Sequence, residues 1–159
     1  MEGVWTMVVR NESQALCVAV EMERRAIRVY ERALLLAKDA EVISGVQEIL
    51  ADEKNHLTRF SEMKASHPVD ASEERLLISA MAADVLFTGG VMEMKREQAL
   101  TTLRSLYQYA ADSEADAVRT YAEFAQKCGD PAVKEAFLSI AREESTHLAE
   151  LKNKLASLA

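Results

Sequence analysis

The residues at 49–57, I-L-A-D-E-K-N-H-L, return in altered form at 140–148 as I-A-R-E-E-S-T-H-L. The match extends outward, because residues 14–65, shifted by 91 positions, align with residues 105–156 without a gap. Each copy carries a Glu followed three residues later by a His, and this spacing places both side chains on one helix face. A further Glu precedes each pair by 30 residues. The sequence therefore predicts two similar helical hairpins.

The composition is typical of a helical globular protein. The chain has 159 residues, of which 49% are hydrophobic and 28% charged, enough for one domain with a sizeable core. Only 5 Gly and 2 Pro interrupt it, which argues against an all-β fold with its frequent turns. The net charge of −7 argues against a general nucleic-acid binder. The 2 Cys are too few for a zinc ribbon or a disulfide framework.

The sequence carries no signal for export or membrane insertion. The N-terminal residues, M-E-G-V-W-T-M-V-V-R, lack a basic region followed by a long apolar one. The most apolar stretch, at 76–87, is shorter than the roughly 20 residues that a membrane span needs. We therefore expect a cytoplasmic protein without a nucleic-acid or membrane partner.

Caps and breakers divide the chain into five expected helices. A capping pattern at Asn11 predicts a helix start near Glu12, and Pro68 ends the second helix because proline disfavours helix in the residue before it. Asp130 and Pro131 are typical of an N-cap and of a first helical residue. Asp39 is the expected N-cap of the second helix, so that the expected helices are 12–38, 40–66, 73–87, 92–127 and 131–157.

The four long helices carry apolar seams at alternating steps of three and four, and one Glu interrupts each seam midway. Such seams are typical of near-parallel bundle packing. We expect an all-α four-helix bundle forming one domain over residues 1–159, with hairpins at 12–66 and 92–157. The crossover at 67–91, with its short helix, is long enough to span the bundle. The helices on either side of it should therefore run parallel.

The polar residues in the seams predict a metal site. Carboxylates buried together repel one another unless cations compensate, and two divalent cations balance four carboxylates. One Glu from each of two helices and a Glu-x-x-His pair from each of the other two would form a dinuclear site. This ligand set suits iron or manganese better than zinc or copper. A metal-free bundle is the alternative, but the agreement between the two halves favours a metal. The predicted ligands are Glu23, Glu53, His56, Glu114, Glu144 and His147.

Several neighbours of these residues also match across the repeat. Tyr30 and Tyr121 lie seven residues after the first Glu of each hairpin. We expect each to donate a hydrogen bond that orients a ligand Glu, with a plain core role as the alternative and a redox-active phenol as a less favoured one.

Two pairs of carboxylates match as well. Asp52 and Glu143 directly precede the second Glu of each hairpin. They are expected to be solvated, with cation uptake as an alternative role. Glu21 and Asp112 lie off the main seams, and contact with the histidines is a role that this position leaves open.

The segments E-R-R-A-I-R-V-Y (23–30) with E-K-N-H (53–56), and E-A-D-A-V-R-T-Y (114–121) with E-S-T-H (144–147), resemble the two halves of a rubrerythrin-type ferritin-like di-iron domain. The resemblance covers roughly residues 12–157 and implies two iron ions held by the six predicted ligands. Rubrerythrins reduce hydrogen peroxide and are re-reduced by a rubredoxin-type centre. The resemblance therefore implies a peroxide reductase.

The chain departs from that family in two ways. It has no C-x-x-C pair, whereas a rubredoxin domain carries two, so the electron donor should be a separate protein. Rubrerythrins also carry a further Glu one turn before the Glu of the third bundle helix, where this chain has Ala111. This leaves a more ferritin-like ligand set.

We expect Glu53 and Glu144 to bridge the two irons, with hydrogen peroxide or oxygen as the oxidant. Three other functions stay open: a ferroxidase or iron-handling protein, a di-iron hydroxylase, and a non-catalytic iron-binding protein. A homodimer is expected, with exchange of hairpins between the two chains as a variant of it.

Overall fold

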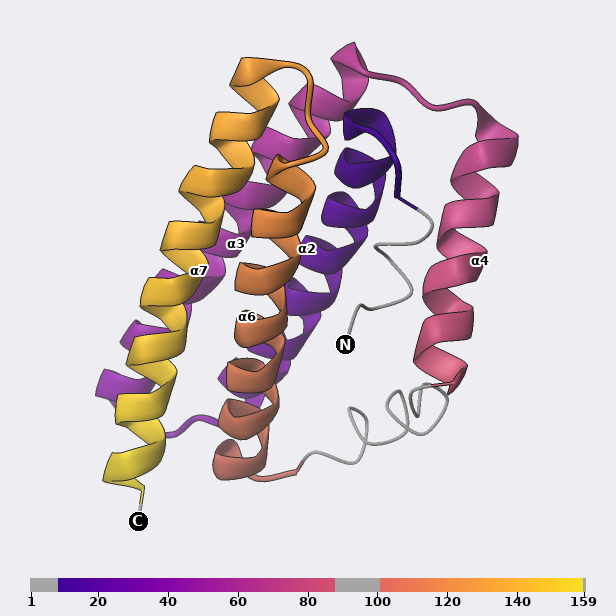
Figure 1. Cartoon of the computed structure of the whole chain (residues 1–159). Coiled ribbons are helices and arrows are strands. Elements are labelled where there is room, and N and C mark those ends of the chain that lie inside the picture. Colours follow the sequence, from indigo (N-terminus) through magenta and orange to yellow (C-terminus); the bar gives the residue numbers. More distant parts are fainter. Residues whose placement is uncertain (1–8, 88–100, 159) are drawn as a thin grey trace.

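A computed structural model of the chain describes residues 9–87 and 101–158, without the side chains of 82–87. The described residues form five helices and no strand (Figure 1). The helices are α2 (Glu12–Leu36), α3 (Ala40–Ser66), α4 (Ala71–Phe87), α6 (Leu103–Ala125) and α7 (Pro131–Ser157).

The four long helices form a bundle of two hairpins, as predicted. Helix α2 packs on α3, α6 packs on α7, and α2 also lies against α6. Helices α3 and α6 run in the same direction, whereas α2 and α7 run in the opposite one (Figure 1). Helix α4 lies beside α2 and runs along the length of the bundle, as the predicted crossover requires.

Side-chain caps define several of the helix starts. Asn11 accepts a hydrogen bond from the backbone N–H of Gln14 at 3.0 Å, and Asp39 caps α3 in the same manner. Asp130 caps α7, and Pro131 is its first residue, a position where no backbone N–H is needed. The caps predicted from the sequence are thus confirmed.

The start of α6 differs from the expectation. Thr102 has an extended backbone (φ −115°, ψ 150°), and its side chain accepts a hydrogen bond from the backbone N–H of Ser105. Residues 101 and 102 therefore lie outside the helix, and the prediction of one continuous helix from residue 92 is wrong. The part of that prediction at 92–100 lies outside the described residues.

The other boundaries shift by about one turn or less. Helix α2 ends at Leu36, before the predicted residue 38, because Ala37 is already extended (φ −74°, ψ 134°) and leads into the cap of α3. Helix α4 begins at Ala71, two residues before the predicted start. Helix α6 ends at Ala125, two residues before the predicted end.

Two apolar clusters fill the bundle, and a layer of polar side chains lies between them. Along α3 the order is Ile49 of one cluster, then Glu53 and His56, then Phe60 of the other cluster. Four aromatic rings dominate the cluster at the α6–α7 turn, with neighbouring centroids 5.0–5.8 Å apart. They belong to Phe60, Tyr121, Phe124 and Phe137.

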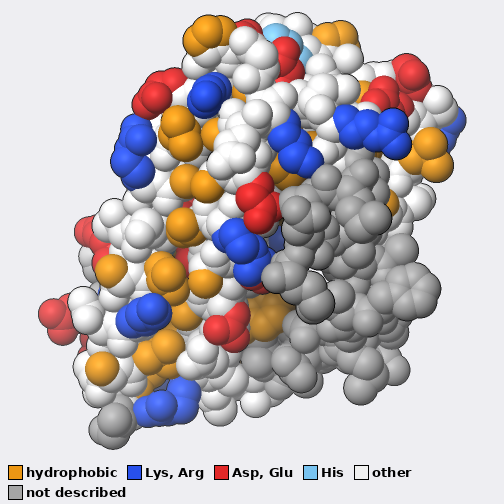
Figure 2. Space-filling view, in the orientation of Figure 1, with side chains coloured by type: hydrophobic (Ala, Val, Ile, Leu, Met, Phe, Trp, Pro, Cys, Tyr) orange, Lys and Arg blue, Asp and Glu red, His pale blue; other side chains and the backbone are white. Residues whose placement is uncertain are grey.

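The face shown in Figure 2 carries Lys, Arg, Asp and Glu side chains interspersed with small groups of hydrophobic ones. A search of the described helices for a membrane span finds none of sufficient length and apolarity.

Candidate metal centre

The six predicted ligands come together at mid-height of the bundle. Helices α2 and α6 each contribute one glutamate, and α3 and α7 each contribute a glutamate and a histidine one turn later. Every one of the six residues is buried, with at most 3% of its surface exposed. The residues are Glu23, Glu53, His56, Glu114, Glu144 and His147. That they bind metal stays a prediction at this point.

The six residues form two overlapping groups of potential ligands. One group is Glu23, Glu53, His56 and Glu144, and the other is Glu53, Glu114, Glu144 and His147. Within each group, one ligand atom per residue lies within 4.8 Å of every other. Glu53 and Glu144 belong to both groups, which is the arrangement expected of two cations joined by bridging carboxylates.

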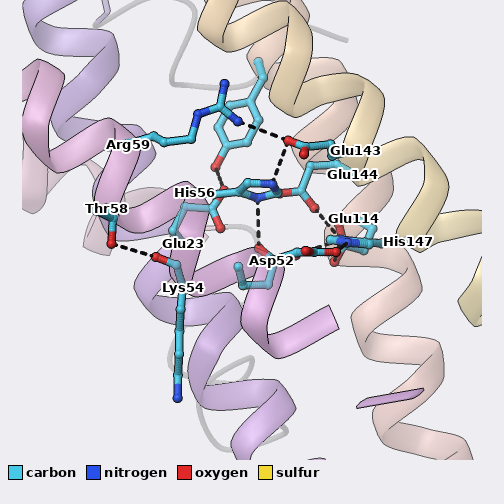
Figure 3. Close-up of polar contacts among 12 residues, drawn as sticks. Glu23, Asp52, Lys54, His56, Thr58, Arg59, Glu114, Glu143, Glu144 and His147 are labelled. Carbon is cyan, nitrogen blue, oxygen red and sulfur yellow. Dashed lines mark hydrogen bonds and ion pairs between the residues drawn. The ribbon is translucent and has the colours of Figure 1, made fainter. Parts of the chain in front are cut away.

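The histidines reach across the bundle toward the opposite hairpin. Nδ1 of His56 lies 3.0 Å from Oε1 of Glu144, and Nδ1 of His147 lies 2.9 Å from Oε1 of Glu53. The two rings are stacked with centroids 6.0 Å apart. Both Nδ1 atoms therefore point toward the four carboxylates, and both Nε2 atoms point away from them (Figure 3).

Burial and mutual contact strongly shift the ionisation of this cluster. Burial, together with the adjacent carboxylate of Glu53, raises the pKa of Glu23 well above its usual value. Burial likewise raises the pKa of Glu114, with a hydrogen bond to Glu144 adding to it. Burial alone would lower the pKa of His56, but hydrogen bonds to the surrounding carboxylates raise it to about 12. The metal-free cluster thus retains protons that offset its negative charge.

These residues fit a pair of divalent cations. Three buried carboxylate oxygens, the Oε2 atoms of Glu23, Glu53 and Glu114, have no hydrogen-bond partner. Unpaired buried polar atoms are unfavourable, and a cation would satisfy them. Four carboxylates carry four negative charges, which two divalent cations neutralise while the histidines stay uncharged. Oxygen and imidazole ligands are those that iron and manganese accept.

Two tyrosines bind the outer glutamates, Glu23 and Glu114, each of which belongs to only one ligand group. Each tyrosine reaches the glutamate of the other hairpin. The hydroxyl of Tyr30 donates to Oε1 of Glu114, and the hydroxyl of Tyr121 donates to Oε1 of Glu23 at 2.8 Å. Burial, together with the nearby carboxylate charges, raises the pKa of both phenols well above the usual value. They therefore remain protonated donors, which is the contact expected of residues that orient ligands. Each tyrosine serves the glutamate of the other hairpin.

The outer nitrogens of the histidines contact two carboxylates to which the sequence assigned another role. Nε2 of His56 lies 3.0 Å from Glu143, and Nε2 of His147 lies 3.0 Å from Asp52. The signal in the sequence was that 52 and 143 match across the repeat and lie on the helices that also carry the histidines. Both side chains remain about half exposed, at 56% for Asp52 and 44% for Glu143, so the expected solvation is present as well.

Glu21 and Asp112, for which contact with the histidines was left open, pair with other residues instead. Glu21 pairs with Arg24, and Asp112 accepts a hydrogen bond from Gln108. Each contact lies within a single helix, α2 for Glu21 and α6 for Asp112, and faces solvent. The reason is that both carboxylates lie off the apolar seams that meet at the centre of the bundle.

Comparison with known proteins agrees with this architecture. Residues 11–157 match the family described as the ferritin-like domain. Comparisons with curated proteins and with solved structures give no significant match. The matched segment covers all four bundle helices and all six residues of the buried cluster, so the chain belongs to the ferritin-like domain family.

Proposed function

We propose that the chain is a dinuclear-iron oxidoreductase that reduces hydrogen peroxide with electrons from a separate donor protein. The observation that carries this proposal is the pair of overlapping ligand groups that share Glu53 and Glu144. A single cation would need only one such group. Manganese remains the alternative metal, because it accepts the same oxygen and imidazole ligands.

Iron bound in this cluster would supply the two electrons that convert hydrogen peroxide and two protons to two water molecules. The side chains of the protein fix the geometry in which this occurs. Asp52 and Glu143 hold the outer nitrogens of the histidines, so that each Nδ1 is presented to the carboxylates. Tyr30 and Tyr121 fix the carboxylates of the outer glutamates.

The apolar clusters on both sides of the polar layer limit the access of water along the axis of the bundle. Helices α3 and α7 approach each other less closely than α2 and α6 do. The half-exposed Asp52 and Glu143 lie on α3 and α7. A small oxidant such as hydrogen peroxide would reach the centre from this side.

The choice of peroxide as oxidant rests on the resemblance of both Glu…Tyr and Glu-x-x-His segments to those of rubrerythrins. One observation favours a second candidate, a ferroxidase that oxidises ferrous iron as its substrate with oxygen. Ala111 is buried one turn before Glu114, at the position where rubrerythrins carry a further glutamate. The methyl group of Ala111 cannot bind a metal, so the cluster keeps only the six ligands described above. This is the more ferritin-like ligand set.

A rapid-mixing experiment distinguishes the two candidates. The protein is loaded without oxygen with two ferrous ions per chain and then mixed with hydrogen peroxide or with oxygen, while the ferric absorbance is followed. We expect oxidation by peroxide to be much faster, and a Glu53→Ala variant, prepared in parallel, to show no protein-bound ferric signal. Faster oxidation by oxygen would contradict the peroxidase and favour the ferroxidase or a hydroxylase. Iron uptake without oxidation by either would indicate a non-catalytic iron-binding protein.

A further inference from the structure

The two histidines of the buried cluster differ in the residues next to Nε2, the ring nitrogen that points away from the four carboxylates. Behind His56, Oε2 of Glu143 accepts from two donors: Nε2 of the histidine lies 3.0 Å away, and Nη1 of Arg59 lies 3.3 Å away. Figure 3 shows both side chains reaching the same end of Glu143. The positive charge of Arg59 therefore compensates the carboxylate that supports His56.

Behind His147 this compensation is missing. Oδ2 of Asp52 lies 3.0 Å from Nε2 of His147, and among the described residues no Lys or Arg pairs with Asp52. The repeat places Glu150 at the position that corresponds to Arg59, three residues after the histidine. Glu150 is exposed. The corresponding position thus carries a negative charge in one half and a positive charge in the other.

This difference acts on a bound cation in two ways. A carboxylate shared with a guanidinium is a weaker acceptor for the imidazole N–H, and a weaker acceptor makes the imidazole a poorer metal ligand. The charge of Arg59 also repels a divalent cation directly, whereas Glu150 at the corresponding position attracts one. Both effects have the same sign, and both disfavour the His56 side.

We propose that Arg59 makes the two cation positions unequal, so that a divalent cation first fills the position of Glu114 and His147 and only then that of Glu23 and His56. This inference rests on the proposed metal-binding function. Arg59 acts as a positioning residue through Glu143, since it lies outside both ligand groups. Glu53 and Glu144 contribute to both positions, so they do not create the preference.

The test is a crystal structure of the full chain with one Co²⁺ per chain, in which anomalous scattering gives the occupancy of each position. We expect the His147 position to hold about ten times more cobalt than the His56 position, as outer-shell contacts typically change metal affinity by this factor or more. The Arg59→Gln variant should bring the two occupancies close together. The Arg59→Lys variant keeps the charge and should keep the preference.

A charge exchange separates this electrostatic role from a structural one. The double variant Arg59→Glu with Glu150→Arg should reverse the order of filling, which a mere loss of packing would not do. Arg142→Gln is the matched control, because Arg142 pairs with Glu135 on the exposed face of α7 and should leave the preference unchanged. The unfolding temperature of each metal-free variant verifies that it is folded.

Each outcome of this test decides between the two proposals. Equal occupancy in the unaltered protein, or a preference that persists in Arg59→Gln, would overturn the inference and leave the dinuclear site intact. Cobalt at neither position would overturn the proposed metal-binding function itself.

Discussion

The two hairpins present the same side chains to the centre of the bundle and different side chains behind them. Glu23, Glu53 and His56 in the first hairpin correspond, residue by residue, to the ligand candidates of the second. Next to the outer nitrogen of His56, Glu143 pairs with Arg59, whereas Asp52, next to the outer nitrogen of His147, pairs with no Lys or Arg of the described residues. The two halves are therefore alike in the residues that would bind the cations. They differ in the partly exposed residues that contact the outer nitrogens of the histidines.

The contacts also show that neither hairpin completes its own half of the site. Tyr30 of the first hairpin donates to Glu114 of the second, and Tyr121 donates back to Glu23. The nearest carboxylate to each histidine nitrogen Nδ1 likewise comes from the other hairpin. Each of the two cation positions is therefore formed by residues of both hairpins.

The largest expected effect comes from removing a residue that both halves share. Glu53→Ala or Glu144→Ala should abolish binding of both cations, because each glutamate belongs to both ligand groups. Glu23→Ala and Glu114→Ala should each reduce binding to one cation per chain, since each belongs to a single group. Metal analysis after dialysis, with helical content from circular dichroism as the control for folding, tests this. Two retained cations in Glu53→Ala would contradict the ligand assignment.

Loading both positions should stabilise the whole fold, since the cations relieve repulsion between buried carboxylates. At each of the two positions, a free metal concentration of one hundred times Kd adds about 2.7 kcal/mol to the free energy of unfolding. In a protein of this size that corresponds to a rise of about 5 to 10 °C in Tm. Thermal unfolding with and without ferrous iron or Mn²⁺ measures it. An equal rise in the Glu53→Ala variant would point to binding elsewhere on the protein.

Proton release should accompany binding in both halves. The raised pKa values of Glu23, Glu114 and His56 mean that the metal-free cluster holds protons near neutral pH, and a cation must displace them. The apparent affinity should therefore rise with pH and fall as the solution is acidified. Titration calorimetry in buffers with different enthalpies of ionisation gives the number of protons released. Binding without proton release would show that the cation avoids these groups.

The smallest expected effect separates the two tyrosines. Tyr30→Phe should weaken cation binding at the Glu114 position, and Tyr121→Phe at the Glu23 position, each by about tenfold, the lower end of the usual range for such contacts. The effect crosses from one hairpin to the other because the hydrogen bonds do. Cobalt occupancies in crystals of the two variants measure it. If each change affected the position in its own hairpin instead, the crossed arrangement would be wrong.

Much of the fold follows from the sequence because its signals are local. Apolar steps of three and four define the helices, and Asn11, Asp39 and Asp130 act as the caps that their residue types favour. The convergence of the six cluster residues also follows, because an in-register repeat of a helical hairpin places equivalent seam positions at one depth. The cap at Thr102 was missed, since threonine is a weaker signal than proline or glycine in a long helical pattern.

The contacts between helices could not be read from the sequence in the same way. Spacing along one helix shows that Tyr30 and Glu23 share a face, but not that Tyr30 reaches Glu114 on α6. The contact from Asp52 to His147 depends on how α3 and α7 approach each other, which the pattern of either helix alone does not define. The cytoplasmic location, the dimer and the electron donor remain predictions.

The most direct test of the dinuclear centre is the anomalous scattering of crystals prepared without oxygen and with two ferrous ions per chain. The account predicts two iron peaks within the buried layer, both coordinated by Glu53 and Glu144, one next to His56 and the other next to His147. A single peak there, or iron bound only at the surface with the buried layer empty, would contradict it.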